Sequence, residues 1–123
     1  MTASTQFSFA SRETDWPFKF ADIIVTGTGD TTIVAATAAS VVRVVSVWLV
    51  ANIAGTIVFQ DGTTGDDLTG IINLPANGGF VLPYSPVGWF ETQTVNTELN
   101  MAVTTCTSVD GGIVYQLVEP GIT

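Results

Sequence analysis

The sequence predicts an all-β protein, a single sandwich of antiparallel strands of the jelly-roll or a related Greek-key type, with an N-terminal arm. Short runs of β-branched and aromatic residues recur about every ten residues, separated by turns rich in Gly, Asn, Asp and Pro, which is typical of a sandwich or barrel. No stretch shows the 3.6-residue period of an amphipathic helix. We therefore divide the chain into an arm, residues 1–20, and a sandwich domain, residues 21–123.

Residues 41–60 form the centre of the predicted fold. They read VVRVVSVWLVANIAGTIVFQ, and residues 41–50 are nearly all apolar and rich in valine. Because β-branched side chains favour strands over helices, we expect residues 41–50 to form a strand that is buried on both faces for much of its length, with Trp48 in the core. Residues 51–55 are suited to a turn and residues 56–60 resume the β pattern, which predicts a central hairpin.

A transmembrane helix is the rival interpretation of this region, because residues 33–59 carry only one charge, Arg43. The run is rich in Val, Thr and Ala rather than Leu, and Asn52 and Gly55 fall where the last turns of the helix would be. No cluster of Lys or Arg flanks it, and residues 1–10 lack the basic and apolar regions of a signal peptide. We therefore expect no membrane contact and synthesis in the cytoplasm.

The rest of the chain supplies the other layers as short strands. Residues 27–30 (GTGD) predict a hairpin turn between two strands. The alternation of Leu99, Met101 and Val103 places these three side chains on one face, and residues 80–82, which end before a proline, are expected at an edge or a corner. The predicted strands outside the central stretch cover residues 20–26, 31–37, 68–74, 80–82, 98–103 and 112–118.

The first 20 residues contain five of the twelve aromatic residues of the chain, and Pro17 prevents a long helix there. Two interpretations are open. The segment is either a first strand and a turn that close over the core, or an arm that docks its aromatic side chains on a neighbouring subunit, as aromatic residues do at interfaces. The candidate partner-binding residues are Phe7, Phe9, Trp16, Phe18 and Phe20.

The chain is acidic and has few charged residues. Eleven Asp and Glu against three Lys and Arg give a net charge of −8, and charged residues make up 11% of the chain, against about a quarter in an average soluble domain. So few cations cannot neutralise phosphates, which argues against nucleic-acid binding. Hydrophobic residues make up 46% of the chain, which suggests apolar surface that is hidden in a permanent assembly, an oligomer or a virion.

The residues that carry most enzyme and metal chemistry are missing. There is no histidine and a single cysteine, Cys106, which excludes a zinc site, fits a reducing cytoplasm and leaves Cys106 as a small buried residue. The carboxylates lie mostly in predicted turns. A glycosidase pair such as Asp67 and Glu91 stays open, as does a weak calcium site in the acidic loop 61–67. We predict no enzymatic activity, no metal and no cofactor.

One pattern extends from residue 41 to residue 119. It consists of WLVAN (48–52), IVFQ (57–60), LTG (68–70), LPANGG (74–79), PY (83–84), GWFET (88–92), LN (99–100) and GIVY (112–115). This succession resembles a β-sandwich module of small virion proteins of tailed bacteriophages, and the likeness covers about two thirds of the chain. The N-terminal arm has no counterpart in it.

The resemblance implies a capsid decoration or cement protein, a type that often forms trimers clamping the joints between major capsid subunits. We therefore predict a structural virion protein on the capsid surface that binds the major capsid protein and assembles as a homotrimer. The alternatives are a tail or fibre component and a receptor-binding, carbohydrate-binding module. In the carbohydrate-binding alternative Trp89 and Phe90 would stack on sugar rings; otherwise they plug the end of the sandwich.

Overall fold

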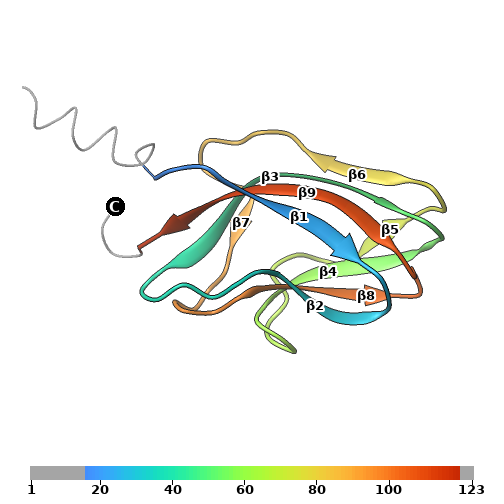
Figure 1. The fold of residues 1–123 in the computed structure, drawn as a ribbon, viewed down its shortest axis with the longest axis horizontal. Coiled ribbons are helices and arrows are strands. Elements are labelled where there is room, and N and C mark those ends of the chain that lie inside the picture. The colour runs from blue at the N-terminus through green and yellow to red at the C-terminus, as the bar shows by residue number, and fades with distance from the viewer. Residues whose placement is uncertain (1–15, 120–123) are drawn as a thin grey trace, which may run out of the picture.

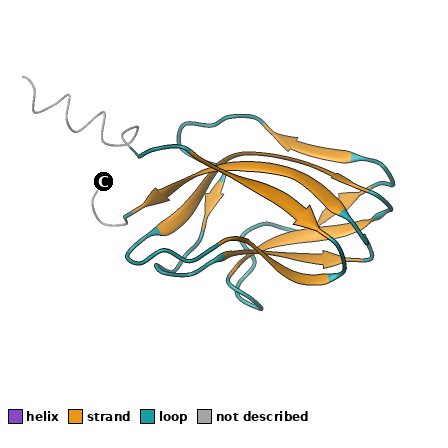
Figure 2. Cartoon of the chain, in the orientation of Figure 1, coloured by secondary structure: helices purple, strands orange, loops and turns teal. Residues whose placement is uncertain are grey.

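Nine strands make up the part of the chain that the computed structural model describes, residues 16–119 (Figures 1 and 2). None of the elements in this range is a helix able to cross a membrane. In chain order the strands are β1 (Lys19–Val25), β2 (Gly29–Val34), β3 (Val41–Ala51), β4 (Gly55–Asp61), β5 (Ile72–Leu74), β6 (Gly79–Leu82), β7 (Phe90–Glu91), β8 (Leu99–Thr104) and β9 (Val109–Val118).

The strands form two antiparallel sheets that pack against each other (Figure 1). Sheet A has the order β1-β9-β3-β6, with the short β7 also paired to β3, and sheet B has the order β2-β8-β4-β5. Apart from β7, this is the strand order of a jelly roll, in which the chain passes repeatedly between the two sheets. The predicted all-β antiparallel sandwich is confirmed.

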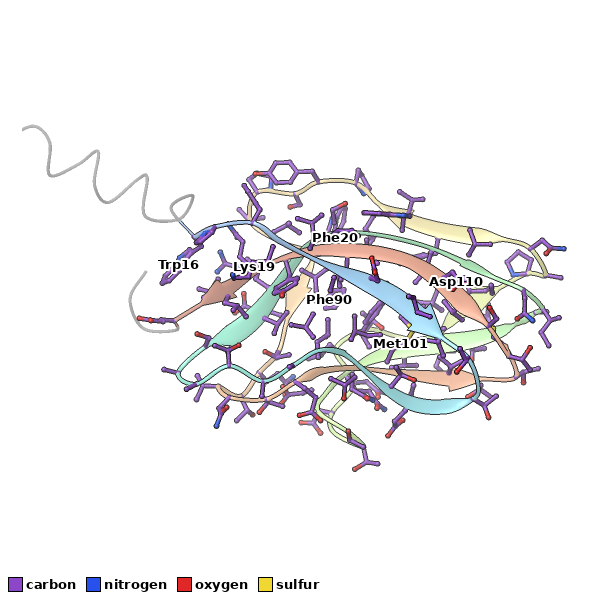
Figure 3. All side chains as sticks on the ribbon, viewed as in Figure 1. Trp16, Lys19, Phe20, Phe90, Met101 and Asp110 are labelled. Carbon is purple, nitrogen blue, oxygen red and sulfur yellow. The ribbon has the colours of Figure 1, made fainter. Side chains whose placement is uncertain are left out.

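The core lies between the sheets, and both sheets contribute to it by strand alternation. From sheet B come Phe59 and the row Leu99, Met101 and Val103, all buried as the alternation predicts. Figure 3 shows Met101 and Phe90 between the two layers, and the Phe59 and Phe90 rings lie 5.1 Å apart. Cys106 is fully buried in the same core, as expected for a small apolar residue.

Strand β3 is buried on both faces only in its first half. Its register against β9 shifts between Val44 and Ser46, which marks a bulge at Val45, and both Val44 and Val45 are fully buried. Beyond the bulge the strand alternates strictly, and Trp48 is 42% exposed. The prediction that Trp48 belongs to the core is therefore wrong, because the valine-rich run does not reveal where double-sided burial ends.

The two predicted hairpins are also wrong. Residues 26–28 connect β1 in sheet A to β2 in sheet B, and residues 52–54 likewise cross from β3 to β4. Asn52 explains the second crossing: its Oδ1 accepts hydrogen bonds from the backbone N–H groups of Thr107 and Ser108, at 3.2 and 2.9 Å. These bonds hold Asn52 against residues 105–108, the connection that crosses from β8 to β9. Glycine and asparagine suit hairpins and crossings alike, so composition does not separate them.

Further boundaries differ from the sequence prediction; for example, β2 ends at Val34 rather than at residue 37, and β9 begins at Val109 rather than at residue 112. Strand β5 contains only Ile72–Leu74, because the preceding residues from 68 to 71 are irregular and only an isolated bridge between Gln60 and Asp67 continues the pairing. Strand β1 begins at Lys19, so Lys19 and Phe20, assigned to the arm, belong to sheet A. The short β6 lies at the edge of sheet A, as predicted.

Candidate docking surface

The outer face of sheet A is apolar over most of its centre. Strand register places side chains from neighbouring strands in rows: Trp48 stands opposite Val81 of β6 on one side and Gly112 of β9 on the other. Seven large apolar side chains on this side of the sandwich have between 42% and 66% of their surface exposed. We call them the aromatic face; they are Phe18, Phe20, Ile24, Trp48, Val50, Val81 and Tyr84.

Ring contacts organise the aromatic face. Phe20 and Trp48 lie nearly parallel with centroids 5.8 Å apart, and Phe18 meets Tyr84 edge to face at the same distance. A Cβ added to Gly112 would lie 2.6 Å from Trp48 Cζ2 and 2.7 Å from Phe20 Cε1. Gly112 therefore leaves the space in which the Phe20 and Trp48 rings meet above the sheet.

The aromatic face is comparable in size to the largest apolar patch of an ordinary monomer. An aromatic side chain has about 150–250 Å² of surface, so four of them, half exposed, present roughly 400 Å² before the aliphatic members are counted. The largest apolar patch on an ordinary monomer is about 300–600 Å² and is often functional. The aromatic face therefore has the dimensions of an interaction surface.

Two carboxylates lie among the apolar side chains of the aromatic face. Asp22 stands opposite Gly112, and Asp110 stands opposite Ile24 and Val50, which makes the two aspartates diagonal neighbours, roughly 7 Å apart. Figure 3 labels Asp110 on β9, beyond Phe20 along the sheet. The Ser108 hydroxyl donates to Asp110 Oδ2 at 3.0 Å; within residues 16–119 no cation pairs with either aspartate.

The structure places the predicted partner-binding residues in three settings. Phe18 and Phe20 belong to the aromatic face. Trp16 is half-buried, and its carbonyl accepts a hydrogen bond from the buried Gln116 Nε2 at 2.9 Å, so it packs against the sandwich. Phe7 and Phe9 lie outside the described residues. Thus Phe18 and Phe20 fit the docking interpretation, whereas Trp16 fits the interpretation of a segment that closes over the sandwich.

Five members of the aromatic face escaped the sequence prediction: Ile24, Trp48, Val50, Val81 and Tyr84. Alternation after the β3 bulge would have assigned Trp48 and Val50 to the side opposite Val47 and Leu49. The signal was hidden because the residues on both sides of this strand are apolar. Tyr84 follows β6 in a loop, and no local pattern places it beside Phe18.

Trp89 and Phe90 do not form a paired platform. Phe90 is partly buried and packs on Phe59, which agrees with the plug interpretation. Trp89 is half-exposed, and its indole Nε1 donates to the Pro83 carbonyl at 2.6 Å. The two side chains thus point to different environments, and the platform suggested for the carbohydrate-binding alternative is wrong.

Carboxylates in and beside the acidic loop 61–67 accept hydrogen bonds from within the protein. Asp61 Oδ1 accepts from the backbone of Gln93 at 3.0 Å, and Glu98 Oε2 accepts from the N–H and hydroxyl of Thr63 at 3.1 and 3.0 Å. Hydrogen bonds from its own backbone and from Thr63 lower the pKa of Glu98. Among the residues that the structure describes, no group of three Asp, Glu, His or Cys is placed to hold a metal ion.

The two carboxylates considered for glycoside hydrolysis have other partners. Glu91 Oε2 accepts from Arg43 Nε at 3.0 Å in sheet A, and Asp67 Oδ1 accepts from Gln60 Nε2 at 3.2 Å beside sheet B. An open hollow of about 520 Å³ lies near the crossing into β4. Its lining contains no ionisable side chain; it consists of Ala54, Gly55, Thr56, Asn73, Leu74, Pro75 and Thr105.

Comparison with known proteins adds no family to this description: no protein-family model matches the chain, and no curated protein matches it. The fold and the surface define the class to which the chain belongs, a jelly-roll sandwich with one apolar outer face.

Proposed function

We propose that this protein is a structural virion protein, a capsid decoration protein that binds the major capsid protein on the outer surface of the shell and stabilises it. The observation that carries the proposal is the aromatic face, with half-exposed Phe20 and Trp48 on sheet A and half-exposed Tyr84 in the loop after β6. Tryptophan and tyrosine are enriched among the residues that dominate protein interfaces. Docking this face on the capsid would remove it from water.

The fold supports the same proposal by analogy. Jelly rolls are common in viral capsid and lectin domains, and fold alone does not select between such functions. The resemblance of residues 41–119 to small tailed-phage virion proteins favours a role on the capsid. Only 11% of the residues are charged, which fits a protein that is permanently part of an assembly.

Many copies would make a modest contact sufficient. A standard interface buries about 800 Å² on each partner, of which the aromatic face would supply roughly half through its rings. Ligands that bind only the assembled state favour it by mass action. A homotrimer belongs to the proposal because it joins three such faces and raises their effective concentration at the shell.

The experiment is an add-back assay on capsids that were assembled without the protein. Purified protein should bind them, and Trp48→Ser and Tyr84→Ser should each reduce the bound fraction at least tenfold. Ile71→Ser is the matched control, because Ile71 is 68% exposed but lies before β5, outside the aromatic face; it should bind as the wild type does. Capsids that lack the protein should release DNA at a lower temperature. Equal binding by all variants would refute docking through sheet A.

A receptor-binding, carbohydrate-binding module of a tail or fibre is the second candidate. Exposed rings beside the carboxylates of Asp22 and Asp110 favour it, because sugars stack on aromatic rings and donate hydrogen bonds to carboxylates. Particles without the protein would then be as heat-resistant as the wild type but would fail to attach to host cells. Binding of the purified protein to a glycan array, lost in Trp48→Ser, would support this candidate over the first.

A further inference from the structure

The aromatic face carries negative charge and no matching positive charge. Of the two cations among residues 16–119, Arg43 is paired with Glu91 and lies seven residues from Val50 along β3, about 23 Å at 3.3 Å per residue. Lys19 is three residues from Asp22 in β1, so alternation sends the two side chains to opposite faces. Asp22 and Asp110 therefore have no counter-ion from the sandwich itself.

A second copy of the same face is a poor match. If two aromatic faces met, both copies would place Asp22 and Asp110 inside the interface, with no cation to receive them. Burying unpaired carboxylates is strongly unfavourable, and like charges opposite each other disfavour the pairing further. A different surface of another copy offers little more, since the whole chain contains only three Lys and Arg.

A cationic partner matches both the rings and the carboxylates of the aromatic face. A guanidinium ion binds the faces of Trp and Tyr rings, and it pairs with carboxylates through two parallel hydrogen bonds. The Phe20 and Trp48 rings cover Gly112, and Asp22 lies in the same row beyond it, so an arginine lying on these rings would be within reach of a carboxylate. Apolar side chains beside it would contact Val50, Val81 and Ile24.

We infer that the aromatic face binds an extended segment of a different protein in which arginine alternates with apolar residues, the arginines lying over Asp22 and Asp110. The inference rests on the proposed function, because it specifies the chemistry of the partner that docks there. The aromatic face would then bind a different protein rather than a second copy, and the binding would weaken as the salt concentration rises.

The test uses the full-length protein and two synthetic peptides: one alternates Arg with Leu, and its twin has citrulline, a neutral analogue, in place of each Arg. Titration calorimetry should give at least tenfold tighter binding of the arginine peptide at about 50 mM salt and a much smaller difference at about 500 mM, where the screening length is a few ångströms. Asp22→Asn/Asp110→Asn should bring the two affinities within about twofold. Trp48→Ser should weaken both peptides.

The control for net charge is Asp66→Asn/Asp67→Asn, which removes the same charge from the acidic loop beside sheet B and should keep the preference for arginine. Equal loss of preference in both double variants would overturn the inference, since net charge would then explain the binding. So would stronger peptide binding by Phe7→Ser/Phe9→Ser/Arg12→Gln, which would make the chain's own N-terminal segment the occupant. Dimerisation in ultracentrifugation that Trp48→Ser abolishes would overturn it in favour of a second copy.

The capsid add-back assay separates this inference from the proposed function. If Trp48→Ser loses capsid binding while Asp22→Lys/Asp110→Lys keeps it, docking through the aromatic face stands and the cationic partner is wrong. If neither variant affects capsid binding but the peptide preference holds, the face binds a cationic segment of some other protein and the capsid proposal fails.

Discussion

The two outer faces of the sandwich differ, although the two inner faces serve the same core. On sheet B the register aligns Thr32, Asn100 and Gln60 in one row, and the Asn100 Nδ2 donates to Gln60 Oε1 at 3.0 Å. On sheet A the corresponding central row holds Trp48 and Val81. One outer face is polar and bonded within the chain, and the other is apolar and exposed.

The acidic residues follow the same division only in part, because on sheet A Asp110 accepts a hydrogen bond from Ser108 and Glu91 pairs with Arg43. Beside sheet B, Asp30 and Glu98 accept hydrogen bonds from the loop after β4, at Thr64 and Thr63, so these carboxylates have partners inside the protein. Asp22 on sheet A accepts none within residues 16–119. Most of the polar groups named on the sheet B side are bonded within the protein, although the buried Asn100 Oδ1 has no hydrogen-bond partner. The aromatic face instead combines exposed rings with two carboxylates that no cation of residues 16–119 pairs. This difference supports the proposal that the protein docks through the sheet A side.

The largest expected effect is a loss of stability when a side chain of the core shared by the two sheets is truncated. Phe59 of β4 is fully buried and packs on Phe90 of β7 across the core. Phe59→Ala should lower the free energy of unfolding by about 3–5 kcal/mol, the usual range for truncating a buried aromatic side chain. Urea denaturation measures it. A loss below about 1 kcal/mol would show that the sheets are not joined through this contact.

A smaller effect separates the inner and outer sides of one strand. In β9 a Cβ at Gly111 would overlap the backbone of Trp48, which cannot move aside, whereas a Cβ at Gly112 would meet only the ends of the Trp48 and Phe20 rings. Gly111→Ala should cost about 3 kcal/mol, the upper end for overpacking, and Gly112→Ala about 1 kcal/mol. Thermal unfolding ranks the two. The reverse order would contradict the description of Gly112 as covered by side-chain rings rather than by backbone.

Half-exposed Trp48 should matter less for stability than for binding. Trp48→Ser removes its contact with Phe20, worth about 1 kcal/mol, and the packing of the buried part of the side chain, worth roughly another 1 kcal/mol. The free energy of unfolding from urea titration should therefore fall by about 2 kcal/mol, against the larger loss at Phe59. A loss near 4 kcal/mol would return Trp48 to the core and would remove the basis of the aromatic face.

The sequence was sufficient for the fold class and for much of the core. Alternation identified Leu99, Met101 and Val103 correctly, because one side of β8 is apolar and the other is mostly polar. It failed for Trp48, because in β3 both sides are apolar and a bulge changes the alternation. It also failed for the connection at residues 51–55, since crossings between sheets and hairpins use the same turn residues.

The candidate site was only partly predictable for a related reason. Phe18 and Phe20 attract attention as part of an aromatic cluster, but Tyr84 joins them only through a contact 66 residues away in the chain. Ile24 and Val81 resemble any other strand residue. Their role depends on which strands become neighbours in sheet A, and β9, which brings β1 and β3 together, is the last strand of the described chain.

The smallest predicted effect tests the internal bonding beside sheet B through its pH dependence. The ordinary pKa of a glutamate is 4.5, and hydrogen bonds from its own backbone and from Thr63 hold the pKa of Glu98 below that value in the folded protein. A lowered folded pKa means that the charged form stabilises the fold. This stability is fully present above pH 4.5 and is lost as pH falls through the folded pKa.

Glu98→Gln should therefore lower the melting temperature near pH 7 by a few degrees at most, because Glu98 is solvent-accessible and water competes for its hydrogen bonds. The difference from the wild type should disappear as the pH falls below 4.5. Asp22→Asn is the matched control on sheet A, where no hydrogen bond within residues 16–119 reaches the carboxylate, and it should not lower the melting temperature at either pH. If Asp22→Asn destabilises the protein as much as Glu98→Gln, the carboxylates of the two outer faces are equivalent and the division between a bonded and a binding face is wrong.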